Sequence, residues 1–178
     1  HWHEDIELHY VVSGESVIKL LKEEILACEG DLVIANSNIL HEGFCDSPSM
    51  ETLVVIFDMA DFSRELADKN IIFQSLIRND REVVRIMRNI DEELNRGEIG
   101  EKLVCKGYLL QLVAYLVRHY ALEMLDKGDS LRRHKKLERL NIVYQYIESH
   151  YASPISNREL ADLIHVSEGR FNHIFKES

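Results

Sequence analysis

The first sixty residues alternate between short apolar runs and turn-forming residues. The runs are short and no helical period survives, which predicts β-strands at residues 8–12, 16–21, 24–28, 32–35 and 52–57. Gly14, Gly30 and the stretch 36–38 (Asn-Ser-Asn) lie between the runs. Strands spaced this closely are typical of a compact antiparallel barrel or jelly roll, which encloses a pocket.

The middle of the chain changes to a helical period. Apolar positions recur three and four residues apart over residues 82–95 and 103–125, which predicts two amphipathic helices with a break at 96–100 (Arg-Gly-Glu-Ile-Gly). The second helix is nearly apolar around its circumference at 108–117, so we expect burial on more than one side. It covers the barrel, pairs with a second subunit, or does both.

The last forty residues predict short helices joined by a tight turn at 164–166. Ser156 or Asn157 caps one helix and Ser167 caps the next. Their apolar spacing is typical of a three-helix helix-turn-helix, in which two helices pack crosswise. The residues concerned are Leu160, Ala161, Leu163, Val166, Phe171, Ile174 and Phe175. A small helical bundle with an ordinary polar face is the alternative.

The second of these helices turns a polar face outward when Phe171, Ile174 and Phe175 are buried. The outward positions form a candidate DNA-binding surface of Gly169, Arg170, Asn172, His173 and Lys176. In a major groove, we expect Asn172 and His173 to meet base edges, whereas Arg170 and Lys176 suit phosphates.

The sequence YIESHY at 146–151, followed by residues 155–178, resembles the first helix-turn-helix of the AraC family of bacterial transcription regulators. Gly169 replaces a bulkier residue expected at a base-contacting position. Family members carry two such units joined by a long helix, so the resemblance implies that this chain holds only the first unit and is a fragment. It also implies that the helical hairpin pairs two subunits.

Two motifs in the predicted barrel resemble those of the cupin superfamily. The first runs from His1, His3 and Glu7 to Gly14, and the second from Gly30 to His41. Asn36, Asn38 and Cys45 replace the usual proline, glycine and asparagine of the second motif. In cupin enzymes the residues matching His1, His3, Glu7 and His41 bind one divalent metal, and such ligands suit iron, manganese, nickel or zinc. Because His1 lies inside the first motif, we expect an upstream strand to be missing.

The same four residues have other uses. They could bind a small polar ligand such as a sugar or metabolite, with Trp2, Tyr10 and Phe44 as aromatic walls. Alternatively, the three histidines and Glu7 could be ordinary surface or core residues without a ligand.

Composition and charge narrow the class of protein. A length of 178 residues with 46% hydrophobic content fits one main domain plus a partial second. No apolar run reaches about 20 residues and no secretory signal opens the chain, so we expect a cytoplasmic protein without a membrane partner. The three cysteines, Cys28, Cys45 and Cys105, lack C-x-x-C spacing and are predicted to be reduced thiols.

The net charge of −10 lies at the front of the chain. Residues 1–60 hold 12 acidic and 2 basic side chains, whereas residues 129–178 hold 7 and 8. The run 131–136 (Leu-Arg-Arg-His-Lys-Lys) either contacts a nucleic-acid backbone or is a solvated linker.

Together these features predict an α+β protein. A cupin-like ligand-sensing barrel or jelly roll occupies residues 1–60, a dimerising helical hairpin 61–128, a basic linker 129–136, and a partial helix-turn-helix DNA-binding domain 137–178. The predicted function is a ligand-responsive transcription regulator, not an enzyme, with DNA, a small-molecule effector and a second copy of the chain as partners.

Two further functions stay open at this point. One is a metal-dependent cupin oxygenase or isomerase, for which only Glu42 and His9 lie near enough in sequence to act as general acid or base. The other is a pure dimerisation module, if the pocket is closed.

Overall fold

The computed structural model describes residues 3–21, 23–44, 50–63, 66, 69–125, 139–140, 142–147 and 149–176. The chain divides into two compact units, His1–Lys127 and Gly128–Ser178, and each is described by itself.

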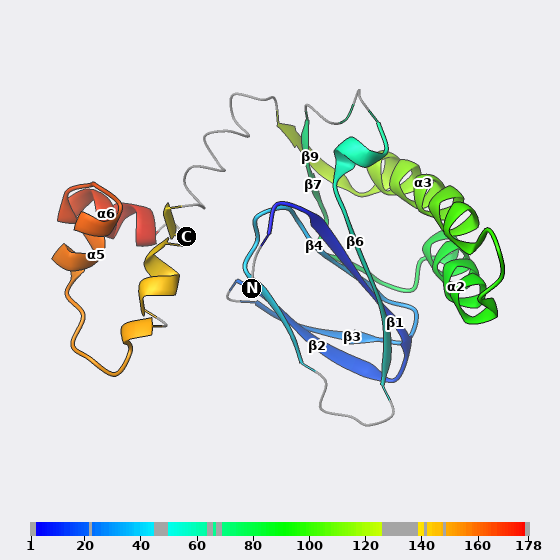
Figure 1. The fold of residues 1–178 in the computed structure, drawn as a ribbon, viewed down its shortest axis with the longest axis horizontal. Helices are drawn as coiled ribbons and strands as arrows, with labels where there is room; N and C mark the ends of the chain where they lie inside the picture. The colour runs from blue at the N-terminus through cyan, green and yellow to red at the C-terminus, as the bar shows by residue number, and fades with distance from the viewer. Residues whose placement is uncertain are drawn as a thin grey trace. The chain divides into compact units, whose positions relative to one another are not determined.

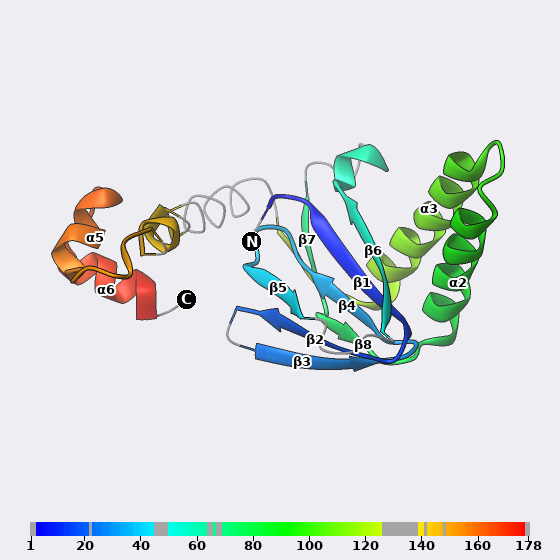
Figure 2. The same cartoon turned by 60° about the horizontal axis from the view of Figure 1, so that its bottom comes forward.

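The first unit is built on antiparallel sheets (Figure 1). Its strands are β1 (Ile6–Ser13), β2 (Glu15–Leu20), β3 (Glu23–Cys28), β4 (Leu32–Ala35), β5 (His41–Phe44), β6 (Glu51–Phe57), β7 (Asn70–Phe73), β8 (Leu76–Ile77) and β9 (Ala121–Leu125). One sheet has the order β6-β1-β4-β8, a second β3-β2-β5, and β7 pairs with β9. Figure 2 shows the three-stranded sheet lying along one side of the four-stranded sheet.

The five predicted strands are present, with ends shifted by at most two residues. The prediction of a closed barrel is wrong, because the strands of the described residues form separate sheets. The strand region also extends beyond residue 60, because β8 pairs with β4 and adds an edge to the four-stranded sheet. The side-chain amide of Asn36 joins β7 to this region, donating to the carbonyl of Phe73 at 2.9 Å and accepting from its N–H at 2.7 Å.

Alternation along β1 and β4 divides the apolar residues between two cores. Ile6, Leu8 and Tyr10 of β1 lie in the larger core, which also contains residues of the two helices. Val11 of β1 and Val33 of β4 lie in the smaller core, with Ile18, Leu20, Ile25 and Ala27 of the three-stranded sheet. One face of the four-stranded sheet therefore packs on helices, and the other, called here the inner face, turns toward the second sheet.

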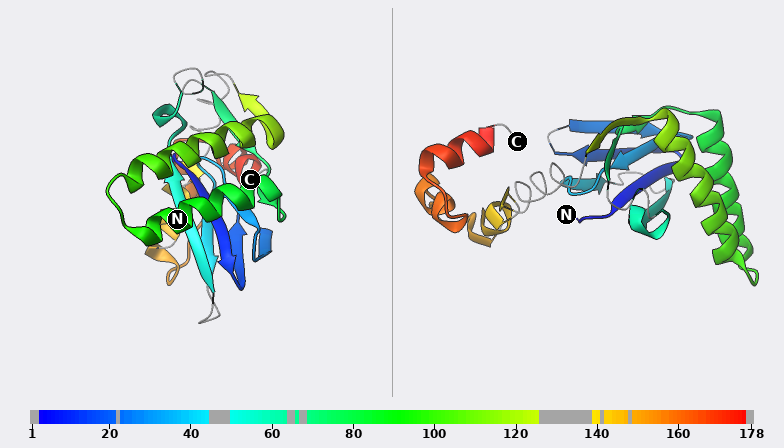
Figure 3. Two further views of the ribbon diagram at one scale, coloured as in Figure 1. Left: turned by 90° about the vertical axis from the view of Figure 1, so that its right-hand side faces the viewer. Right: turned by 90° about the horizontal axis from the view of Figure 1, so that it is seen from above.

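A helical hairpin covers the first of these faces (Figure 3). Helix α2 spans Arg81–Arg96 and α3 spans Glu101–His119, after a short 3-10 helix η1 at Met59–Asp61. The Asp80 carboxylate caps α2 by accepting from the N–H groups of Glu82 and Val83. Gly97 ends α2 with a φ of 63°, a left-handed conformation that glycine adopts without strain, so the predicted break is confirmed.

The predicted extension of the second helix to residue 125 is wrong. Helix α3 ends at His119, and the following residues form β9, which pairs with β7. Tyr120, at the junction, donates its hydroxyl hydrogen bond to Asp80 at 2.8 Å. The helical spacing of apolar residues continues past His119, but the pairing of β9 with β7 decides the structure there.

The second unit is a small helical unit with α5 at Asn157–Leu163 and α6 at Glu168–Lys176. The described residues between 139 and 150 are also helical. Ser156 accepts from the N–H of Glu159, and Ser167 accepts from that of Arg170, as the predicted caps require. Leu160, Ala161, Ile164, Phe171 and Val143 form its core. Of the helices that the structure describes, none combines the length and apolar character needed to cross a bilayer.

Candidate functional site

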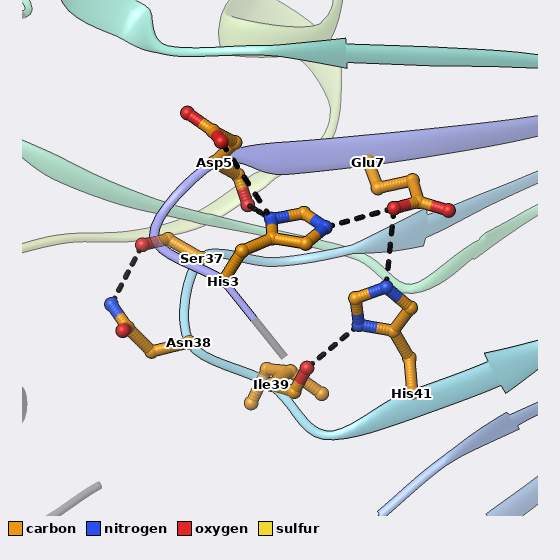
Figure 4. Close-up of polar contacts among 7 residues, drawn as sticks. All are labelled: His3, Asp5, Glu7, Ser37, Asn38, Ile39 and His41. Carbon is orange, nitrogen blue, oxygen red and sulfur yellow. Dashed lines mark hydrogen bonds and ion pairs between the residues drawn. The ribbon is translucent and has the colours of Figure 1, made fainter. Parts of the chain in front are cut away.

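Four polar residues gather on the inner face of the first unit, and we call them the His–Glu cluster: His3, Glu7, His9 and His41. Glu7 and His9 alternate along β1 with core residues, His3 precedes that strand, and His41 begins β5. Nε2 of His3 lies 2.8 Å from Oε2 of Glu7, and Nε2 of His41 lies 3.2 Å from the same oxygen (Figure 4). Nε2 of His9 lies 2.9 Å from Oε1. One buried carboxylate therefore contacts three imidazoles.

The backbone orients two of these rings. Nδ1 of His3 donates to the carbonyl oxygen of Asp5 at 3.1 Å, and Nδ1 of His41 donates to that of Ile39 at 2.8 Å (Figure 4). A neutral imidazole carries one N–H, so each ring then turns the lone pair of Nε2 toward Glu7. Two lone pairs facing a carboxylate need a cation between them, either extra protons or a metal ion.

This arrangement fits a metal site. Metal-binding histidines generally donate their second ring nitrogen to a backbone carbonyl or a carboxylate, as His3 and His41 do. Ligand atoms of His3, Glu7 and His41 all lie within 4.8 Å of one another. Bonds of about 2.0–2.2 Å to a shared zinc ion require only small shifts from these positions.

Burial and charge act on the carboxylate in opposite directions. Burial tends to raise the pKa of Glu7. When the imidazoles carry the extra protons, the hydrogen bond from His3 and the charges of His9 and His41 outweigh burial, so the pKa of Glu7 lies below its ordinary value. Burial lowers the pKa of His9, against the opposing charge of Glu7. The cluster is therefore arranged to keep Glu7 ionised, the form that binds a cation.

The sequence-predicted site residues have different outcomes. The structure brings His3, Glu7 and His41 together, whereas His1 and Trp2 lie outside the described residues. Phe44 ends β5, and its side chain is likewise outside the described part.

The prediction that Tyr10 forms an aromatic wall of the ligand site is wrong. Tyr10 points to the helix-facing side of β1 and is 1% exposed in the larger core, so it does not line a site with Glu7. The reason is parity: odd-numbered residues of this strand face inward at Glu7 and His9, and even-numbered ones face the helices.

The same parity identifies His9, which was considered only as an acid or base for the enzyme alternative. It lies two residues after Glu7 on β1, and strand alternation alone places it on the same face. Glu42, the other residue considered, is exposed and pairs with Lys19 across β5 and β2.

The predicted DNA-binding residues lie on α6 of the second unit. Gly169, Arg170 and His173 are exposed and Asn172 is half-buried, while Phe171 and Ile174 are buried. Lys176 ends the helix, and its side chain is outside the described part. The predicted basic linker, 129–136, lies outside the described residues as well.

Comparison with known families gives a match over residues 1–113, to the AraC-like ligand binding domain. The chain belongs to this family. The AraC-like ligand binding domain here contains the whole His–Glu cluster, α2 and part of α3. A domain of this kind indicates a regulator that senses a small molecule, rather than an enzyme. No curated protein matches the chain.

Proposed function

We propose that the protein is a ligand-responsive, sequence-specific transcription regulator that acts in the bacterial cytoplasm. One observation carries the proposal: a single chain joins an AraC-like ligand binding domain to a helical unit whose last helix exposes polar side chains. The small molecule is a sugar or metabolite bound on the inner face of the first unit.

DNA recognition rests on the two sides of α6. Its apolar side holds the second unit together, and its polar side offers the donors and acceptors that read base edges. Arg170 neutralises a phosphate, while Asn172 and His173, one turn into the helix, meet bases.

Selection of binding sites from random duplexes, followed by gel-shift titration, tests this function. Asn172→Ala should cost about 1–3 kcal/mol on the selected site and little on random DNA. Arg170→Ala should weaken both and reduce the salt dependence by about one phosphate contact. Arg118→Ala, which removes an exposed cation from α3, is the matched control. A protein with no preference over random duplex overturns the proposal.

Dimerisation through α3 completes the proposed regulator. Leu112, Val113 and Leu116 are buried in the larger core, but Leu103 is 78% exposed and Leu110 43%. These two leucines lie seven residues apart, on one side of the helix, and suit a second copy of α3. Leu110→Glu should shift the protein toward monomer in light scattering, whereas Gln111→Glu, an exposed position about 100° further around α3 with the same change in charge, should not.

Ligand binding then changes DNA affinity by favouring one arrangement of the dimer. A coupling free energy of about 1–3 kcal/mol changes occupancy severalfold. Gel-shift titration with and without a bound metabolite measures it.

A divalent metal held by His3, Glu7 and His41 is part of the proposal, with iron, manganese, nickel or zinc as the candidates. When bound, such an ion would polarise and orient an oxygen atom of the small molecule. The same cluster favours the second candidate function, a metal-dependent oxygenase or isomerase, in which His9 is the nearest acid or base. Metal analysis of the purified protein, combined with the DNA assay, separates the two functions.

A further inference from the structure

The edge strand β6 places apolar side chains directly beside the His–Glu cluster. In the antiparallel register, Ile56 pairs with Glu7 and Val54 pairs with His9. Paired residues of neighbouring antiparallel strands point to the same face of a sheet. Val54 and Ile56 therefore belong to the inner face, as neighbours of the cluster.

Burial differs sharply across this face. On the β4 side, Glu7 and His9 pair with Ala35 and Val33, both 0% exposed under the three-stranded sheet. On the β6 side, Val54 is 45% exposed and Ile56 53%. The inner face is thus left uncovered at Val54 and Ile56, and the cluster lies at the border between a packed core and an open apolar surface.

Two buried polar atoms on the same face lack a hydrogen bond within the described structure. Nε2 of His9 is close to Glu7 but not aligned for a hydrogen bond, and its side chain is only 9% exposed. Oγ1 of Thr52, which pairs with Val11 one step further along β6, is the other. A buried polar atom left without a partner costs free energy, so a ligand that supplies one is favoured.

We propose that the small molecule bound on this face is amphipathic, with an oxygen-bearing head at the His–Glu cluster and an apolar body lying on Val54 and Ile56. The proposal rests on the proposed ligand-sensing function and names the class of ligand. Of the two classes proposed above, a sugar or another metabolite, this surface favours the second, because the hydroxyl groups of a sugar would lose water against Val54 and Ile56 without gaining partners. An aliphatic or aromatic body gains by covering them.

Calorimetric titration of the full chain tests the proposal with octanoate, 1-octanol and L-arabinose, each with and without Zn²⁺. We expect one or both aliphatic probes to bind and arabinose not to. The acid and the alcohol differ only in the head, so the stronger binder tells whether the head is a carboxylate or a hydroxyl.

The double variant Val54→Ser with Ile56→Ser should weaken the aliphatic probes at least tenfold. Leu26→Ser is the matched control: Leu26 is 49% exposed on β3 but lies between the core residues Ile25 and Ala27, so it points away from the inner face. A melting temperature without probe confirms that each variant folds. Binding of arabinose alone, binding of no aliphatic probe, or equal binding by the double variant overturns the proposal. The assay contains no DNA, so its failure leaves the regulator function standing, and a failure of DNA recognition leaves this result unaffected.

Discussion

The two faces of β1 are one residue apart in sequence and opposite in chemistry. Toward the helices, Ile6, Leu8 and Tyr10 are at most 3% exposed in a continuous apolar core. Toward the second sheet, Glu7 and His9 are almost as deeply buried, at 4% and 7%, but they are polar. The two sides are therefore buried to a similar degree but affect the fold differently. Burial of the apolar helix-facing residues stabilises the fold, whereas burial of the polar inner residues destabilises it and forms the candidate site.

Such a division is costly because buried charge and unaligned polar atoms oppose folding. The helix-facing core must supply the free energy that the inner face does not. Substitutions on the two faces should accordingly differ in size and in kind.

The largest effect is expected from Leu8→Ala on the helix-facing side. Leu8 is fully buried, so its loss leaves a cavity and should lower the free energy of unfolding by about 2–5 kcal/mol. Urea denaturation measures this change. A loss below about 1 kcal/mol would show that the core collapses around the gap and that the two faces contribute alike.

Glu7→Gln tests the inner side. If the cluster binds metal, Zn²⁺ at about one hundred times its dissociation constant should stabilise the wild type by about 2.7 kcal/mol and the variant hardly at all. Thermal melts with Zn²⁺ and then with a chelator measure the difference. Glu42→Gln, beside His41 but exposed, is the control. Equal stabilisation of wild type and Glu7→Gln would argue against the metal.

The Asp80 carboxylate, on the helix-facing side, can be compared with the Glu7 carboxylate of the inner face. Burial tends to raise the pKa of Asp80, but hydrogen bonds from the Val83 N–H, both Tyr120 and Tyr115, and the Glu82 N–H lower it below the ordinary value. Asp80→Ala should cost about 1–2 kcal/mol at neutral pH through loss of the helix cap.

That cost should depend on pH. A lowered native pKa means that the carboxylate stabilises the fold above its ordinary pKa, near about 4, and loses this effect as pH falls through the native value. Denaturation of wild type and Asp80→Ala at pH 7 and pH 3 should therefore show a smaller difference in acid. A difference that grows in acid would contradict the assigned hydrogen bonds.

The smallest effect is expected from Val54→Thr on the open part of the inner face. Val54 is 45% exposed and its replacement has nearly the same shape, so the free energy of unfolding should change by no more than about 0.5 kcal/mol. Chemical denaturation measures it. A loss comparable to that of Leu8→Ala would mean that Val54 belongs to a packed core.

Local signals predicted the hairpin and the short C-terminal helices well. Gly97 ends α2, and Ser156 and Ser167 cap their helices, because each acts on backbone groups within a few residues. Strands β5, β7, β8 and β9 were missed because they are short and their partners lie far away in sequence, as β9 shows by pairing with β7. Short strands with distant partners carry little local pattern.

The site was predicted in part for the same reason. The resemblance to the cupin motifs indicated His3, Glu7 and His41, and the structure brings them together. Tyr10 was placed wrongly and His9 was undervalued, because the motif does not state which parity of β1 faces inward.

By itself, the sequence determined five of the nine strands in the described chain, the helical hairpin with its break and the capped starts of the two C-terminal helices. Through its resemblance to the cupin motifs, it also indicated three of the four residues of the His–Glu cluster. Only the tertiary structure decided that the sheets stay separate in the described chain, that β1 turns its odd residues inward, and that Val54 and Ile56 lie open beside Glu7. The physical reason is that caps and turns act between near neighbours, whereas the side of a strand that is covered depends on which distant strand or helix packs against it.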